Sequence, residues 1–282
     1  MRSVEHHGVE NRPAPWHVVA LGTLLAIVLG IGGATIAQRS AHHTASVSLG
    51  FLAAARAKTG KVNNFRVSMT VKIKVSGHHL TEQLLGELGQ HPFRMSLGAE
   101  LPGGLGRMDE RAVGRTLYMR LARTDINGKH WIAYTLPARS TTRVGVSDPL
   151  GMLRTLTGAT GSVVRAGTKT IDGVKTTRYK ATLRPKAVVG QLPSDLRQSL
   201  GASSGVLNSI GSIPVEVYIA GDNTVRRVTE KLSFGGVTAT IELNLTPLGH
   251  PARVVAPPAG DVVRAKTMSE LFQDLRLPAG VG

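Results

Sequence analysis

Residues 65–76 read FRVSMTVKIKVS, and apolar and polar side chains alternate along them without a break. Phe65, Val67, Met69, Val71 and Ile73 share one phase, and serine, threonine, lysine and arginine fill the other. Successive side chains of a β-strand point to opposite faces, so this period of two predicts a strand with one buried face and one solvated face.

The same alternation recurs along the chain. It predicts further strands at 93–99, 113–121, 130–136, 174–183, 215–219, 225–234 and 237–245. Asn127-Gly128, residues 221–223 (GDN) and Gly235-Gly236 are turn signals between consecutive strands. Eight or nine strands, each with one apolar and one polar face, predict an α+β fold with a single large antiparallel sheet. The polar or glycine-rich stretches 76–91, 101–108 and 137–147 are expected to be loops.

Few helices are expected to cover the apolar face of this sheet. The candidates are 47–58, 148–156, 194–207 and a C-terminal amphipathic helix and tail at 264–282, where Thr267 and Glu270 have the spacing of a capping box. A one-sided sheet with sparse cover leaves an apolar groove, which is a ligand site.

The N-terminal region predicts a membrane segment. Residues 18–37 contain no charged side chain and would span about 30 Å as a helix, enough to cross a bilayer. We expect a cytoplasmic tail at 1–16, a transmembrane anchor or signal segment at 17–38, a linker at 39–46 and a folded domain at 47–263. Cleavage before Gln38 would make the chain a secreted protein instead.

Composition narrows the classes of function. The 282 residues include 34 Lys and Arg against 18 Asp and Glu, a formal net charge of +16, and there is no cysteine. Disulfides, thiolate metal sites and a lipidated cysteine are therefore excluded. With only 4% aromatic residues, stacking on nucleic acid is not expected. Basic side chains occupy the polar phase of the strands, which suits either solubility or attraction to anionic lipid headgroups or wall polymers.

No catalytic motif is convincing. Residues 201–205 (GASSG) match G-x-S-x-G around Ser203, but no parallel strand–helix unit surrounds them. Asp109 and Glu110 lie between Arg107 and Arg111, which favours surface ion pairs over acid–base chemistry. The vicinal histidine pairs are poor chelates, because neighbouring strand residues point to opposite faces. We expect no enzyme activity, metal or cofactor.

Five motifs in order carry a family resemblance. They are residues 114–120 (GRTLYMR) with 128–131 (GKHW), 171–179 (IDGVKTTRY), 213–219 (IPVEVYI), 221–228 (GDNTVRRV), and 249–251 (GHP) with 256–259 (APPA). With these five motifs in this order, the chain resembles the LppX/LprG family of mycobacterial lipoproteins, whose fold is similar to that of the carrier LolA.

The resemblance implies a curved half-barrel with a few helices on its concave face and an apolar cavity for the acyl chains of a lipid. It places the domain on the extracytoplasmic side of an actinobacterial cell membrane, holding or handing over lipids for the cell envelope without catalysis. The expected partners are lipid, the cytoplasmic membrane and an envelope protein or transporter, and no nucleic acid. Because the lipidated cysteine of the family is missing here, the N-terminal segment would replace the lipid anchor.

Apolar strand residues are the candidates for the lipid-binding surface: Val67, Met69, Val71, Ile73, Leu117 and Met119. Packing in a closed core is the alternative for each. The alternative function is that of an RseB-like sensor or scaffold domain, which binds a partner protein in the envelope.

Overall fold

The computed structural model describes residues 45–75, 78–101, 106–122, 125–136, 160–183, 212–234, 236–267 and 270–271. One long helix, α2 (Ala45–Gly60), precedes the strands. The first six strands are β1 (Asn64–Val75), β2 (His78–Gln90), β3 (Phe93–Leu101), β4 (Gly106–Val113), β5 (Thr116–Leu121) and β6 (Trp131–Thr135). The others are β7 (Thr160–Ile171), β8 (Val174–Leu183), β9 (Ile213–Ala220), β10 (Val225–Phe234), β11 (Val237–Pro247) and, after the short 3₁₀ turn η1 (Ala259–Asp261), β12 (Val262–Ala265).

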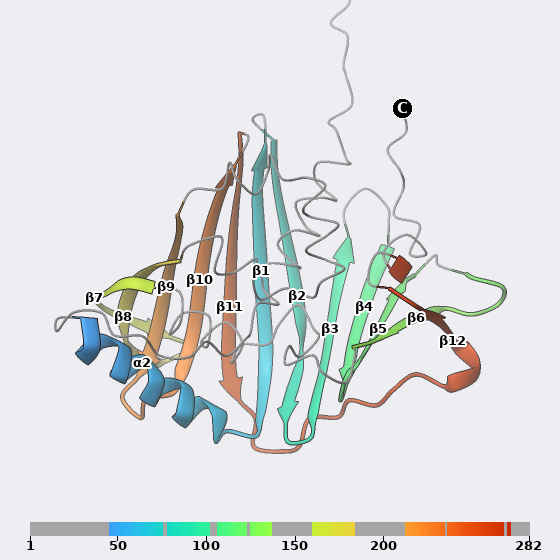
Figure 1. Ribbon diagram of the computed structural model, residues 1–282, viewed down its shortest axis with the longest axis horizontal. Helices are drawn as coiled ribbons and strands as arrows, with labels where there is room; N and C mark the ends of the chain where they lie inside the picture. The colour runs from blue at the N-terminus through green and yellow to red at the C-terminus, as the bar shows by residue number, and fades with distance from the viewer. Residues whose placement is uncertain are drawn as a thin grey trace, which may run out of the picture.

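All twelve strands belong to one open sheet (Figure 1). Their order is β12-β6-β5-β4-β3-β2-β1-β11-β10-β9-β8-β7, so two antiparallel meanders meet where β1 pairs with β11. β12 is added at the edge as a parallel neighbour of β6. The prediction of one large antiparallel sheet with few helices is therefore confirmed for the described residues.

One face of the sheet, here called the inner face, is buried. Along β11 and β3 buried and partly exposed side chains alternate, as the period of two predicted. Helix α2 packs on this face against β7 and β10 (Figure 1). Its Leu52 and Ala55 side chains are buried. The opposite, outer face carries most of the charged side chains.

Polar contacts fix the C-terminal end of α2 to the sheet. The Val225 amide donates to Thr59 Oγ1 over 3.0 Å, and this hydroxyl donates to the Ala55 carbonyl over 2.7 Å. Gln90 Nε2 on β2 donates to the Thr59 and Val62 carbonyls over 3.1 and 2.7 Å. The last turn of the helix and the chain leading to β1 are thus held by both halves of the sheet.

The structure corrects three sequence predictions. Residues 78–90 form β2 and not a loop. Of the loop expected at 101–108, Leu101 belongs to β3 and residues 106–108 belong to β4, and 102–105 lie outside the described residues. The alternation in β2 was hidden because Glu82 and Gly86 occupy inner positions while Leu85, on the outer face, is 60% exposed. Residues 113–121 are not one strand either, since a turn at Gly114, whose φ is +61°, separates β4 from β5.

Other predictions hold, and some lie outside the described residues. The helix at 47–58 is found within α2, and the turns at Asn127-Gly128 and residues 221–223 are present, with φ of 55°, 76° and 64° at Asn127, Gly128 and Asn223. Strand β12 ends at Ala265. The predicted membrane segment, the helices at 148–156 and 194–207, and most of the C-terminal helix fall outside the described residues. Among the residues that are described, no helix has the length and hydropathy of a membrane span.

Candidate functional site

All six predicted lipid-binding residues lie on the inner face. Val67, Met69, Val71 and Ile73 come from β1, and Leu117 and Met119 come from β5; none is more than 4% exposed. Four strand spacings separate β1 from β5, which is about 19 Å. The sheet therefore places the two groups on one surface without bringing them into contact.

Three buried carboxyl groups share this surface, and sequence analysis did not identify them as site residues. Glu82 on β2 is 3% exposed, Glu110 on β4 is 0% exposed and Glu230 on β10 is 6% exposed. Glu110 lies in register with Leu97 and Met119 on the neighbouring strands. The predicted surface ion pair is thus correct for Asp109, which binds Arg107 and Arg120, and wrong for Glu110, because neighbours on a strand face opposite sides.

Glu82 and Glu230 belong to the same transverse row of the inner face. Across β10, β11, β1 and β2 the register joins Glu230 to Ile241, Ile241 to Val71, and Val71 to Glu82. On the other side of Glu230 the row continues through Val215, Ala181 and Val163. Seven strands thus contribute one row of side chains in which the two carboxyl groups are the polar members.

Burial controls the ionisation of both groups. Desolvation raises the pKa of Glu82 and the pKa of Glu230 from 4.5 to about 7. Both carboxyl oxygens of Glu82 are buried and make no hydrogen bond with the described residues. No lysine or arginine is buried in the part of the chain that the structure describes, so no buried cation compensates them. A carboxyl group with a pKa of about 7 is protonated below that pH, and in this form it donates one hydrogen bond and accepts others.

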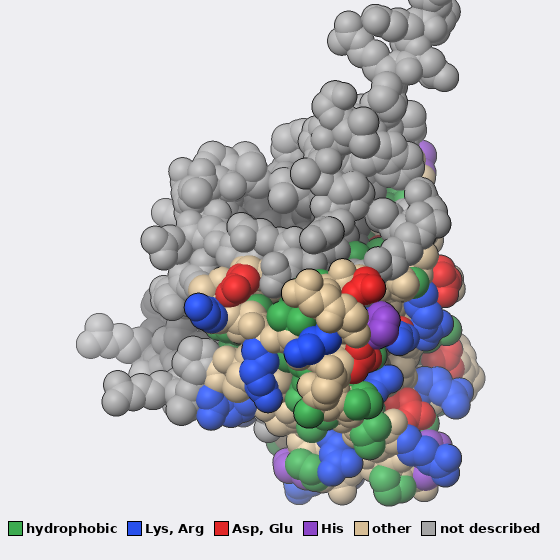
Figure 2. All heavy atoms as spheres, turned by 90° about the vertical axis from the view of Figure 1, so that its right-hand side faces the viewer, with side chains coloured by type: hydrophobic (Ala, Val, Ile, Leu, Met, Phe, Trp, Pro, Cys, Tyr) green, Lys and Arg blue, Asp and Glu red, His purple; other side chains and the backbone are tan. Residues whose placement is uncertain are grey.

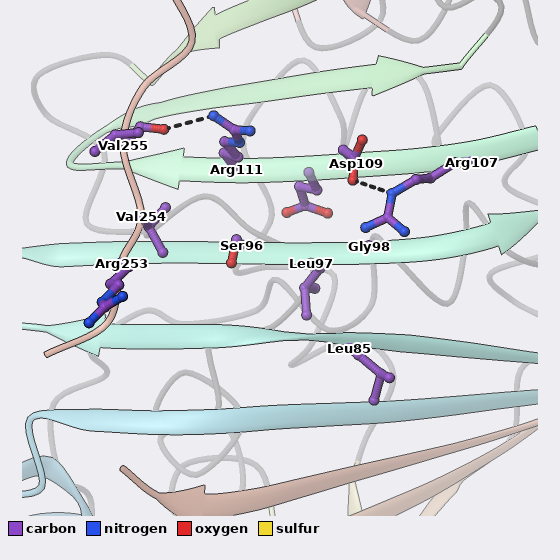
Figure 3. A pocket seen from close by; sticks show the side chains of 11 residues that line it. Leu85, Ser96, Leu97, Gly98, Arg107, Asp109, Arg111, Arg253, Val254 and Val255 are labelled. Atoms are coloured by element: carbon purple, nitrogen blue, oxygen red, sulfur yellow. Dashed lines mark hydrogen bonds and ion pairs between the residues drawn. The ribbon is translucent and has the colours of Figure 1, made fainter. Parts of the chain in front are cut away.

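The outer face has a pocket of a different kind. Residues 253–255 cross β2, β3 and β4 and enclose a shallow hollow of about 270 Å³ (Figure 3). The Arg253 amide donates to Glu87 Oε2 over 2.9 Å, and Arg111 donates to the Val255 carbonyl over 3.2 Å. These bonds hold residues 253–255 against the sheet. The attachment of this segment therefore explains the polar contacts at the pocket.

The charges around this pocket are largely paired. Burial opposes the ionisation of Asp109, but hydrogen bonds from Arg120 and Arg107 outweigh it and lower the pKa of the carboxyl group. The guanidinium groups of Arg111 and Arg120 lie 4.6 and 4.9 Å from the centre of the Trp131 ring. Figure 2 shows basic and acidic side chains interspersed on the edge of the molecule that lies on the right in Figure 1. The pocket therefore has no strong excess of either charge.

Elsewhere on the outer face some basic side chains form no ion pair with the described residues. Lys72 and Lys74 on β1 and Lys231 on β10 are exposed, and no ion pair joins them to a described residue. By contrast, Arg227 pairs with Glu242 over 3.2 Å, and Lys180 lies 3.7 Å from Glu216. The expectation that basic residues gather on the polar phase of the strands is confirmed for these positions.

The remaining chemical candidates find little support. Ser203 lies outside the described residues, as do the histidine pairs at 6–7 and 42–43. His79 is exposed at the start of β2. Among the residues that the structure describes, no three histidine or acidic side chains are close enough to hold a metal ion.

No protein-family model matches the sequence, and no curated protein matches it. Several solved structures are similar in fold. The Mycobacterium tuberculosis lipoprotein LppX has 16% identity and a TM-score of 0.48, over 74% of this chain and 99% of that one. The LolA superfamily protein NE2245 of Nitrosomonas europaea has 10% identity and a TM-score of 0.31, over 71% and 94% of the two chains.

A chain of the Pseudomonas aeruginosa MucA/MucB complex has 12% identity and a TM-score of 0.35, over 76% of this chain and 59% of that one. The similar structures thus include LppX, a member of the family that the sequence motifs resemble, and a LolA superfamily protein.

Proposed function

We propose that this chain is a membrane-anchored, extracytoplasmic protein that binds an acyl lipid on the inner face of its sheet and holds it or hands it over, without catalysis. Val67, Met69, Val71 and Ile73 of β1 and Leu117 and Met119 of β5 are the apolar contacts in this proposal.

One observation carries the proposal. The inner face is a broad apolar surface that also contains the buried carboxyl group of Glu82, whose oxygens make no hydrogen bond with the described residues. A closed core excludes such groups, because each buried polar atom without a hydrogen bond destabilises the folded state by about 1–3 kcal/mol. An amphiphilic ligand would satisfy both parts of this surface, since its chains fit the apolar residues and its oxygens fit the carboxyl groups.

The location follows from the N-terminal sequence and the family resemblance. Residues 18–37 are long enough and apolar enough to anchor the domain. LppX is named a lipoprotein, and the present chain has no cysteine that could carry a lipid. In the proposal the N-terminal segment provides the attachment, and a tether of this kind favours local handover over long-distance transport.

The test is to purify residues 40–282 without detergent and compare native with denaturing mass spectra. A bound species that has the mass of an acyl lipid and is released on denaturation is the expected result. A protein that is empty and also refuses added lipid would contradict the proposal and favour the sensor or scaffold function, which crosslinking in the native membrane would then test.

A matched pair of variants separates the inner face from general damage to the fold. Met119→Trp adds bulk to the inner face of β5 and is expected to reduce the bound lipid. Tyr118→Trp places the same side chain on the outer face of the same strand and is expected to leave the amount unchanged. Equal lipid in both variants would remove β5 from the binding surface.

A further inference from the structure

We propose that Glu82 and Glu230 are the hydrogen-bonding groups with which the inner face recognises the ester or hydroxyl oxygens of an uncharged acyl lipid. This inference rests on the proposed lipid-binding function and specifies the chemical class of the lipid.

The two groups are placed as a pair by the sheet. They occupy the same transverse row, with only Ile241 and Val71 between them. Three strand spacings separate their positions, which is about 14 Å. The row thus has an apolar stretch with a polar group at each end. This arrangement matches a lipid whose acyl chains are apolar and whose oxygen atoms lie at two separate positions.

No ion pair within the described part of the chain explains the burial of the two carboxyl groups. Neither forms an ion pair with a described residue, and the described residues include no buried lysine or arginine. Buried polar groups in native proteins almost always have a hydrogen-bond partner. The oxygens of Glu82 make no such bond within the described part of the chain, so a ligand atom is a suitable partner.

The same surroundings decide which ligand chemistry fits. A phosphate or carboxylate headgroup next to these groups would meet acidic side chains, and no lysine or arginine among the described residues is buried beside them to neutralise it. A protonated carboxyl group donates its O–H to an ester carbonyl or hydroxyl oxygen, and its own carbonyl accepts from a hydroxyl. Both bonds form without burying a net charge. Uncharged esters and alcohols are therefore the favoured class.

The experiment uses the full chain reconstituted in phosphatidylcholine vesicles that contain a trace of one photoreactive probe. The probes are a diazirine triacylglycerol, a diazirine hydrocarbon of the same chain length without esters, and a diazirine alkylamine. After illumination, labelling is measured by peptide mass spectrometry on residues 65–73 of β1. This segment contains no carboxylate, so the preference of alkyl diazirines for acidic side chains does not bias the result.

The variants are Glu82→Leu, Glu230→Leu and the corresponding glutamine exchanges. Leucine suits the apolar surroundings and keeps the domain folded while it removes the hydrogen bond, and glutamine retains a donor and an acceptor. We expect each leucine exchange to lower the ratio of triacylglycerol to hydrocarbon labelling about fivefold, as the loss of one hydrogen bond implies. The glutamine exchanges should preserve the ratio to within about twofold. Glu100→Leu removes an exposed carboxylate from the outer face of β3 and should leave the ratio unchanged.

Each other outcome has a definite meaning. Labelling by both uncharged probes with a ratio that the leucine exchanges do not alter overturns this inference and leaves lipid binding on the inner face intact. Preferential labelling by the alkylamine overturns the uncharged class. Absence of labelling of residues 65–73 by any probe contradicts the proposed function and this inference together.

Discussion

The protonation of Glu82 makes a quantitative prediction about stability. The pKa of its carboxyl group is about 7 in the folded protein, against an ordinary value of 4.5. Because burial raises the pKa in the folded state, the protonated carboxyl group makes its full contribution to the free energy of unfolding below pH 4.5. This contribution is lost as the pH rises to about 7. One pKa unit corresponds to 1.36 kcal/mol, so the loss is about 3 kcal/mol between pH 4 and pH 8.

Glu82→Gln removes this titration while it preserves the shape of the side chain. The unfolding free energy of the variant relative to the wild type should therefore rise by about 3 kcal/mol between pH 4 and pH 8. All other titrating groups are common to both proteins and cancel in this difference. For a domain of this size the expected gain in Tm over the same interval is about 6–12 °C. Urea unfolding at the two pH values, followed by circular dichroism, measures the change directly.

A control and a replicate are available in the same sheet. Glu230→Gln should reproduce the effect, because burial raises the pKa of Glu230 to about 7 as well. Glu100→Gln alters an exposed carboxylate of β3 and should change the unfolding free energy by less than about 0.5 kcal/mol at either pH. If Glu82→Gln had the same effect at pH 4 and pH 8, the carboxyl group would be solvated or paired, and its assignment as a buried neutral group would be refuted.

Three further predictions concern the scaffold that presents the inner face. Gly86→Ala would place a Cβ atom 1.7 Å from the Ser96 carbonyl oxygen, and we expect a loss of about 3 kcal/mol in the unfolding free energy measured with urea. Thr59→Val leaves the buried Val225 amide without its acceptor; a loss of about 1–3 kcal/mol is expected, with faster hydrogen exchange at that amide. Trp131→Leu removes the ring over which two arginine side chains lie at 4.6 and 4.9 Å. Thermal unfolding should show a destabilisation of about 2 kcal/mol, and an unchanged Tm would mean that these contacts contribute nothing.

Much of the sheet could be predicted from the sequence because its inner positions are almost uniformly apolar. The alternation in residues 65–76 predicted β1 and its buried face, and the glycine and asparagine turns predicted the junction of β9 with β10. Local patterns do not specify the pairing of distant strands, and the contact of β1 with β11 was accordingly not predicted. The parallel addition of β12 to β6 depends on a connection that crosses the outer face, for which no sequence rule exists.

The missed strands and the missed site residues have a common cause. Glu82 in β2 and Glu110 in β4 each place a carboxylate at a position where the pattern requires an apolar side chain, so both strands escaped recognition. Glu230 interrupts β10 in the same way, but Val228 and Leu232 restore the phase on either side, and that strand was predicted. A sequence that specifies a fold consistently departs from the pattern mainly where function requires it. An acidic residue in the apolar phase of a one-sided strand is therefore a stronger indication of a ligand-contacting position than the apolar residues around it, which core packing explains equally well.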